Sequence, residues 1–404
     1  MEIRPILSSL RRSPVAGVLI AAQIALTLAI LANVLFIVSD RVDRMSMLSG
    51  VDEPNVFYLS NQNIGALREA IPAVQEDLAA LRAMPGVIAA TGGFALPMGQ
   101  SGWQTSIALK AKEDVDTADR SAAVYFADQQ GIAALGTRLI EGRDFTPGEI
   151  QYFTAGMQPN PSVVLVSKGL AEKLFPGESA IGKMIKMTGD DGEPSQRIIG
   201  VVDHLATPWP RSRNPDRVLF APFVAAGFGF IVRTEPGERD RVMAKVEDSL
   251  FAVNPNRIIP SVRSFHEIRR DAYTNDRAMA VLLTAIGIAL LAVTAFGIVG
   301  QASFWVTQRT KQIGTRRALG ARKVDILRYF QTENALITLI GVAAGCVLAL
   351  AINALLVNYL AFERLPWAWL PVGAVVVLLL GQLAVLGPAM RASRIAPAIA
   401  TRTA

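Results

Sequence analysis

Four long apolar runs alternate with polar stretches along this chain of 404 residues. The runs cover residues 15–38, 278–306, 335–360 and 367–386, and none of them contains Asp, Glu, Lys or Arg. A helix of about 20 apolar residues is long enough to cross the hydrocarbon core of a bilayer. The pattern therefore predicts an α-helical integral membrane protein with four transmembrane helices.

A long stretch of mixed polarity, residues 39–277, separates the first run from the second. Short runs rich in β-branched and aromatic residues predict strands at 56–60, 105–111, 121–127, 163–167, 197–202 and 217–221. Helical periodicity predicts helices at 73–84, 168–175 and 238–253. A stretch of this length can bury its own core, in one lobe or two. We expect a large extracytoplasmic α+β domain inserted between transmembrane helices 1 and 2.

Positive charges gather beside the apolar runs. The short segment 307–334 carries seven Lys and Arg residues against two acids, Asp325 and Glu333. Segments 1–14 and 387–404 are also basic. Because Lys and Arg in short loops are retained in the cytoplasm, both termini and the 307–334 loop are expected there, and residues 39–277 on the other side.

Composition agrees with this class of protein and argues against others. The chain is 51% hydrophobic and 18% charged, with a formal net charge of +6. The cations flank apolar runs instead of lining an aromatic groove, which favours membrane orientation over nucleic-acid binding. A cleaved signal peptide is the alternative for the first run. That run is longer than a signal core and is followed by Ser39-Asp40-Arg41, which favours an uncleaved helix.

Enzymatic chemistry finds little support in the sequence. Residues 177–184 resemble a phosphate-binding loop, but Met184 replaces the hydroxyl residue that would hold Mg²⁺. His204 and His266 are the only histidines and have no zinc-ligand spacing. The single cysteine, Cys346, lies in the third run, so the large domain has no disulfide. We expect no catalytic residue, bound cofactor or metal in this chain.

The absence of helix breakers predicts long stalks. No Pro or Gly occurs between Ser261 and Ile286, so one helix could run from near Ser264 to Gln308. The first helix could likewise extend to Ser49. The alternative is that these outer ends fray or turn. The positions whose helical spacing would pair the two stalks are Val42, Met45 and Leu48 on one, and Phe265, Ile268 and Ala272 on the other.

The order of residues in the 307–334 segment narrows the class. Residues 309–321 read RTKQIGTRRALGA. This resembles the FtsX/MacB-type permease family of ATP-binding-cassette (ABC) systems, whose loop reads roughly R-x-x-E-I-G-x-R-R-A-L-G-A. Gln312 stands where the family usually has Glu, which we interpret as loss of a charge contact and not of the docking element. Without the resemblance, this segment would be an ordinary positive connector that contacts lipid headgroups.

Other segments extend the resemblance over nearly the whole chain. Residues 139–145 (LIEGRDF), 166–183 and 198–203 are similar to the periplasmic core domain of MacB-type members, and residues 388–397 are similar to the family's C-terminal ending. The resemblance implies that segment 307–334 is an ATPase-coupling loop. Its implied coupling residues are Arg309, Lys311, Gln312, Ile313, Gly314, Arg316, Arg317, Ala318, Leu319, Gly320 and Ala321.

The resemblance implies a permease subunit in the bacterial inner membrane that moves a periplasmic domain for efflux or secretion of amphiphiles. Implied partners are a separate cytoplasmic ATPase that uses ATP and Mg²⁺, a second permease subunit (homodimer or paralogue), and a possible periplasmic adaptor with an outer-membrane channel. A lipoprotein-releasing permease and an FtsX-like regulator of a cell-wall hydrolase remain alternatives. Gly341 and Gly345 form a small-xxx-small pair that serves either a subunit interface or packing within one subunit.

Overall fold

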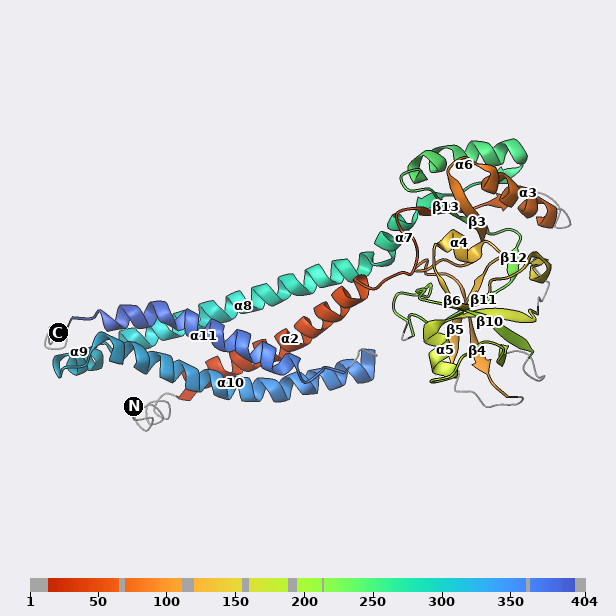
Figure 1. Ribbon diagram of the computed structural model, residues 1–404. Helices are drawn as coiled ribbons and strands as arrows, with labels where there is room; N and C mark the ends of the chain where they lie inside the picture. Colours follow the sequence, from red (N-terminus) through yellow and green to blue (C-terminus); the bar gives the residue numbers. More distant parts are fainter. Residues whose placement is uncertain are drawn as a thin grey trace. The chain divides into compact units, whose positions relative to one another are not determined.

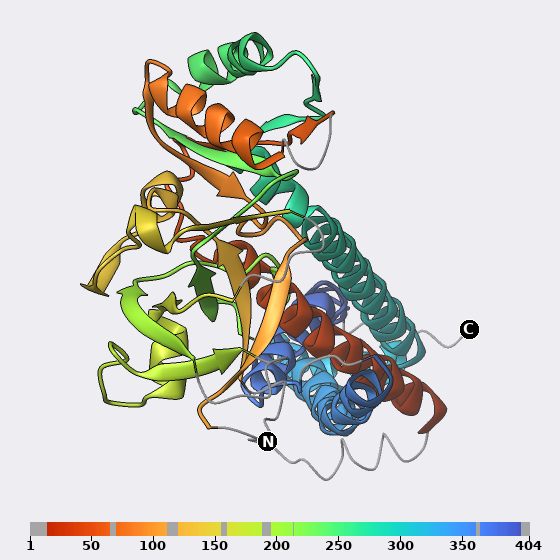
Figure 2. The same cartoon turned by 90° about the vertical axis from the view of Figure 1, so that its right-hand side faces the viewer.

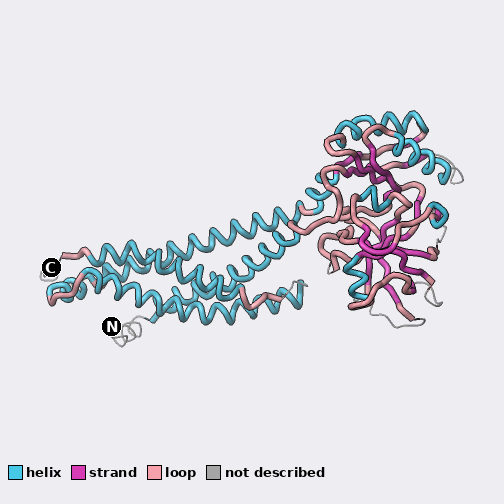
Figure 3. The backbone as a smooth tube through the Cα atoms, viewed as in Figure 1, coloured by secondary structure: helices cyan, strands magenta, loops and turns pink. Residues whose placement is uncertain are grey.

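The computed structural model describes residues 14–64, 70–110, 120–154, 160–187, 195–212, 214–360 and 364–396. The chain divides into a helical unit, Met1–Asp43 with Asp276–Ala404, and an α+β unit, Arg44–Asn275. Strands lie only in the α+β unit among these described residues (Figure 3). The basic segment 1–13, Glu363 of the short connection and residues 397–404 lie outside the described residues.

Four helices of the helical unit are apolar and long enough to cross a membrane, as predicted (Figure 1). They are α2 (Pro14–Met45), α8 (Thr274–Gln308), α10 (Lys323–Leu360) and α11 (Trp369–Ser393). The most apolar window of α2 is 56% buried, against 17% for α8 and 28% for each of the other two. The first helix is therefore the one around which the others pack, and Figure 2 shows the four running side by side.

Neutral polar side chains connect the apolar helices. The hydroxyls of Thr27 in α2 and Thr294 in α8 are 2.7 Å apart. Asn33 of α2 donates to the carbonyl of Ala349 in α10 at 3.2 Å, and Asn334 of α10 donates to the carbonyl of Gly381 in α11 at 3.0 Å. In an apolar environment, an unpaired polar group is costly, so these contacts fix which helix faces meet.

The predicted continuous stalk from Ser264 to Gln308 is wrong. Helix α7 (Phe265–Ala272) ends at Tyr273, and α8 begins at Thr274. Tyr273 is 2% exposed and packs with Met98 and Ala206, and its backbone (φ −103°, ψ 10°) departs from regular helical geometry. Helix α2 ends at Met45 and does not reach Ser49.

The predicted pairing of stalk faces is mostly absent among the described side chains. Met45 and Ala272 pack in the cluster around Tyr273. Phe265 and Ile268 instead enter the main core of the α+β unit, while Val42 and Leu48 are 49% and 76% exposed.

The first sheet of the α+β unit has the strand order β15-β1-β13-β3. Its strands are β1 (Val56–Leu59), β3 (Val87–Gly93), β13 (Gly229–Thr234) and β15 (Val262–Ser264). Helices α3 (Ala70–Ala83) and α6 (Arg239–Val253) pack on it, because their apolar residues recur at helical spacing, as in Val242, Val246 and Leu250. A two-stranded ribbon, β2 (Gln62–Asn63) with β14 (Arg257–Ile258), lies beside this lobe.

The second sheet has the order β6-β10-β8-β11-β5-β4-β9. Its strands are β4 (Trp103–Ala108), β5 (Ser121–Phe126), β6 (Leu139–Gly142), β8 (Val163–Ser167), β9 (Met184–Met187), β10 (Gln196–Val202) and β11 (Val218–Ala221). The smaller elements are α4 (Gly131–Leu135), α5 (Lys168–Leu174), the 3₁₀ turn η2 (Pro147–Glu149), and the pair β7 (Gln151–Phe153) and β12 (Phe223–Ala225). Helices pack on sheets in this unit, and parallel and antiparallel pairs occur in the same sheet, which confirms the predicted α+β class.

Candidate functional site

A short helix, α9 (Thr310–Ala318), joins α8 to α10 within the basic segment 307–334. The chain reverses after it at Gly320, whose φ of +99° is a left-handed conformation that glycine adopts without steric cost. The amides of Gly320 and Ala321 donate to the carbonyls of Arg317 and Arg316, at 3.2 and 3.1 Å, and so close the end of the helix. The Asp325 carboxylate then accepts from the amide of Arg322 at 2.9 Å and caps the start of α10.

One face of α9 is held against the helical unit. Ile313 is 5% exposed and Gly314 is buried. Ile313 belongs to an apolar cluster that includes Phe330 of α10 and Ala389 of α11. The helix is therefore packed on two of the long helices as well as joined to them.

A buried ion pair fixes the start of α9. Arg309 Nη1 donates to both carboxylate oxygens of Glu333 in α10, at 3.0 and 2.9 Å, and the Glu333 side chain is 1% exposed. The Arg309 guanidinium also lies 5.5 Å from the ring centre of Trp305 in α8. Removing one member of such a pair leaves a buried charge, which typically costs about 3–5 kcal/mol.

Two further arginines tie α9 to its neighbours. Arg317 donates from Nη1 to the carbonyl of Ser393 at the end of α11. The Arg316 guanidinium lies 4.8 Å from the ring centre of Tyr329 in α10. Together with Arg309, these residues connect α9 to α8, α10 and α11.

The residues predicted to form the site fall into three groups. Ile313 and Gly314 are buried, while Arg309, Arg317 and Ala321 are half-buried. The exposed ones are Lys311, Gln312, Arg316, Ala318, Leu319 and Gly320. Leu319 is 83% exposed at the tip of the turn, so an apolar side chain stands among cations on the free side of α9.

The glycine pair lies between helices of one chain. A Cβ atom added at Gly341 would meet the carbonyl of Ala21 at 2.8 Å, and one at Gly345 would meet the carbonyl of Ala25 at 2.9 Å. Both carbonyls belong to α2. The pair therefore serves close packing of α10 on α2 within the subunit, which is one of the two uses that its spacing allowed.

Sequence reasoning missed the partners that position α9. Glu333 was visible as one of two acids among seven cations, but its burial and its pairing with Arg309 depend on the hairpin that brings α8 and α10 together. The Ser393 carbonyl and the Tyr329 ring carried no signal in the sequence.

The loop that resembles a phosphate-binding motif is a turn between α5 and β9. Lys183 pairs with Glu178 at 2.7 Å and lies 5.6 Å from the ring centre of Phe175. His204 donates from Nε2 to the carbonyl of Leu48 at 2.8 Å, a contact that holds the chain after α2. In the described part of the chain, no three His, Cys, Asp or Glu residues are grouped so that they could hold a metal ion.

Four membrane-length helices, a large domain inserted after the first, and a basic helix between the second and third give the arrangement expected from the sequence for an ABC-type permease, and the family models agree. Residues 18–249 match the MacB-like periplasmic core domain, and residues 284–397 match the FtsX-like permease C-terminal domain. The chain belongs to the FtsX/MacB-type ABC transporter permease family.

Curated relatives are described as "Macrolide export ATP-binding/permease protein MacB". The one from Bdellovibrio bacteriovorus is 28% identical over 284 residues, 65% of this chain and 41% of its own length. The one from Chromobacterium violaceum is 25% identical over 241 residues, 58% of this chain and 36% of its own length. The chain thus aligns with about two fifths of these relatives. The solved periplasmic region of MacB from Actinobacillus actinomycetemcomitans is 13% identical, covering 57% of this chain and 97% of that one, with a TM-score of 0.35.

Proposed function

We propose that this chain is the permease subunit of a MacB/FtsX-type transporter of the mechanotransmission kind. In this proposal, a separate ATPase binds and hydrolyses ATP with Mg²⁺, and the permease moves its α+β unit in response. The observation that carries the proposal is the position of α9: contacts hold it on three long helices, while Lys311 and, just after the helix, Leu319 remain exposed for a partner.

The exposed side of α9 fits the role of a docking element. A single exposed Leu surrounded by cations can insert into an apolar pocket that has an acidic rim, with the charges setting orientation and rate of association. Because the Arg309–Glu333 pair and the Arg317 contact are short, displacement of α9 by the ATPase moves α8, α10 and α11 with it. The start of α8 follows α7 directly through Tyr273, which provides a covalent route to the α+β unit.

The same family membership supports a proposal for the wider assembly. We propose a pair of permease subunits, identical or paralogous, with two ATPase subunits in the bacterial inner membrane, and both termini and α9 in the cytoplasm. The printed names of the relatives support efflux of macrolide-like or other amphiphilic compounds, with a periplasmic adaptor and an outer-membrane channel as further partners.

The test is purification of the tagged full chain from its native membrane in a mild detergent. The double variant Lys311→Glu, Leu319→Asp changes one exposed residue of α9 and the exposed residue that follows the helix. The variant would lose one charged contact and one Leu side chain that the bound ATPase would cover. This should lower the amount of bound ABC ATPase by about 10-fold or more. The matched control is Lys168→Glu, a 57% exposed position on α5 that should retain the ATPase.

The proteins that copurify distinguish the proposed exporter from the regulatory alternative. An ATPase with a periplasmic adaptor supports the exporter, whereas an ATPase with a wall hydrolase favours the regulatory alternative. A wild-type chain that carries no ATPase, or a double variant that keeps it with unchanged ATPase activity, contradicts the coupling role of α9.

A further inference from the structure

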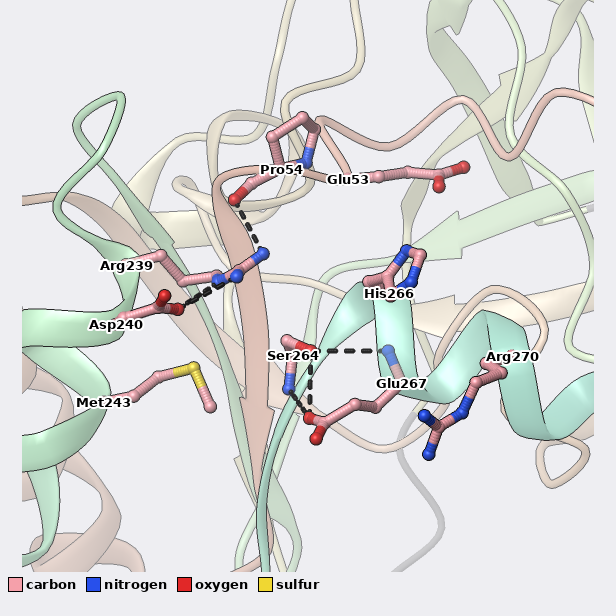
Figure 4. A pocket seen from close by; sticks show the side chains of 9 residues that line it. All are labelled: Glu53, Pro54, Arg239, Asp240, Met243, Ser264, His266, Glu267 and Arg270. Atoms are coloured by element: carbon pink, nitrogen blue, oxygen red, sulfur yellow. Dashed lines mark hydrogen bonds and ion pairs between the residues drawn. The ribbon is translucent and has the colours of Figure 1, made fainter.

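A pocket of about 610 Å³ lies within the α+β unit (Figure 4). Its walls come from three segments: the Glu53–Pro54 turn before β1, the first turns of α6, and the junction of β15 with α7. None of these residues belongs to α9 or to the helical unit. The pocket is therefore independent of the proposed coupling element.

The carboxylates that line this pocket already have partners within the protein. Glu53 accepts hydrogen bonds from Ser49 and Arg269, and Asp240 accepts one from Arg239. Glu267 accepts from the amide and the hydroxyl of Ser264. The Arg239 guanidinium is committed as well, since it also donates to the Pro54 carbonyl at 3.0 Å. Figure 4 shows the contacts of Arg239 and Glu267 as dashed lines.

Two side chains at the pocket, His266 and Arg270, have hydrogen-bond donors that are not used in strong contacts within the protein. Within the described residues, the His266 ring makes no hydrogen bond, and the Arg270 guanidinium makes a long contact of 3.8 Å with Asp271 and is near enough to Glu267 to help the hydrogen bonds from Ser264 lower the pKa of that carboxyl group. Both residues belong to α7 and line the pocket, with His266 on the side of Glu53 and Arg270 on the side of Glu267 (Figure 4). The unused hydrogen-bonding capacity of the pocket is thus that of donors, which suits an anion.

The remaining walls are apolar. Met243 reaches in from α6, and Pro54 closes the side near β1 (Figure 4). Three lining carboxylates would repel a doubly charged phosphate more strongly than a single negative charge. One Arg fork fits one carboxylate in bidentate geometry.

We propose that this pocket binds a monovalent carboxylate with a short apolar group attached, held by Arg270 and His266 and covered by Met243. The same chemistry is found in the C-terminus of a peptide and in a free amphiphilic acid. Binding there would bear on α7, because Arg269 on that helix donates to the carbonyls of Met45 and Met47 at 2.9 and 2.7 Å.

The test uses the full chain in a neutral detergent, labelled with ¹³C at the methyl groups of its 11 methionines. The Met243 signal is assigned from its loss in Met243→Leu. N-acetyl-leucine, which carries a carboxylate and an apolar side chain, should shift this signal saturably. N-acetyl-leucine amide has the same shape without the charge and should not. A charge-assisted contact is worth about 1.5–3 kcal/mol, so Arg270→Gln should weaken binding about 10-fold or more.

The control variant is Arg138→Gln, which alters a 77% exposed arginine of the same unit outside the pocket and should bind as the wild type does. Equal shifts with acid and amide, no saturable shift with either, or unchanged affinity in Arg270→Gln would overturn the proposal. An acetylated tripeptide ending in Leu then separates the sources: much tighter binding than N-acetyl-leucine indicates a peptide C-terminus, and equal binding a free acid. These outcomes do not depend on whether an ATPase docks on α9.

Discussion

At the scale of single residues, the turn after β6 holds two carboxylates in opposite states. Burial, and then the nearby charge of Asp128, raises the pKa of Asp144 to about 6, although the amide of Phe145 opposes the shift. The hydrogen bond from Arg143 lowers the pKa of Glu149 to about 2. One turn therefore contains a carboxylate that destabilises the fold when ionised and another that stabilises it.

Asp144→Asn is expected to stabilise the α+β unit at pH 7.5. The pKa of Asp144 in the folded state lies above its ordinary value of 3.8, so its contribution to stability is greatest below pH 3.8 and is lost as the pH rises through about 6. With a discount for partial exposure, we expect a gain of about 1 kcal/mol at pH 7.5 and about half as much at pH 5. Thermal unfolding of the full chain in detergent at both pH values measures it.

The companion variant Glu149→Gln should change the stability in the opposite direction. The pKa of its carboxyl group is lowered in the folded state, so the ionised group stabilises the fold at pH values above its unfolded pKa. Glu149→Gln should therefore lower the stability at pH 7.5. An Asp144→Asn chain that is no more stable than the wild type at pH 7.5 would show that burial does not penalise the Asp144 charge.

At the scale of elements, the close contact between α2 and α10 depends on two glycines of α10, which have no side chain to keep the helices apart. Gly341→Ala would place a methyl group 2.7 Å from Ile24 Cγ2 and 2.8 Å from the Ala21 carbonyl. Overpacking of this kind costs about 1–3 kcal/mol. We expect a lower thermal unfolding temperature of the full chain in detergent.

Gly300→Ala is the matched control on α8, because no atom lies within 4 Å of a Cβ added there. It should be neutral or slightly stabilising, since Ala favours a helix over Gly by about 1 kcal/mol. Equal unfolding temperatures for the two variants would contradict the packing of α10 on α2.

Some helices and strands could be predicted from the sequence, and others could not. Helices such as α3, α5 and α6 were predictable because their apolar residues recur at helical spacing. Strand β3 was missed because its sequence, VIAATGG, is rich in small residues that carry little strand propensity. The break at Tyr273 was missed because it depends on contacts with Met98 and Ala206, which are distant in sequence.

For the candidate site, the sequence located the residues but not their arrangement. Gly320, one of the predicted coupling residues, forms the turn between α9 and α10. Which residues face inward depends on tertiary contacts: Ile313 is buried by α10 and α11, while Leu319, equally apolar, is exposed. The pocket beside α7 is formed by three segments that are far apart in the sequence, from Glu53 to Arg270, so no local sequence pattern predicts it.

At the scale of the whole molecule, the chain enters and leaves the α+β unit at adjacent points. Strands β1 and β15 pair directly, with Phe57 opposite Ser264. Met45 and Ala272 share one small apolar cluster. A unit whose two ends meet in this way, and which has cores of its own, does not need the helical unit to close its fold.

Residues 44–275, expressed alone, are therefore expected to form a soluble domain that unfolds cooperatively on heating. Since this segment contains no cysteine, its unfolding temperature should not change with a reducing agent. Arg269→Met removes the ion pair with Glu53 and two bonds to the carbonyls of Met45 and Met47, a loss of about 1.5–3 kcal/mol. For a domain of this size, that lowers the unfolding temperature by about 4–10 °C. Arg138→Met, at an exposed pair with Asp203, should change it little. Circular dichroism during heating decides the outcome: a broad, non-cooperative transition in the wild-type segment would mean that the α+β unit depends on the helices for its stability.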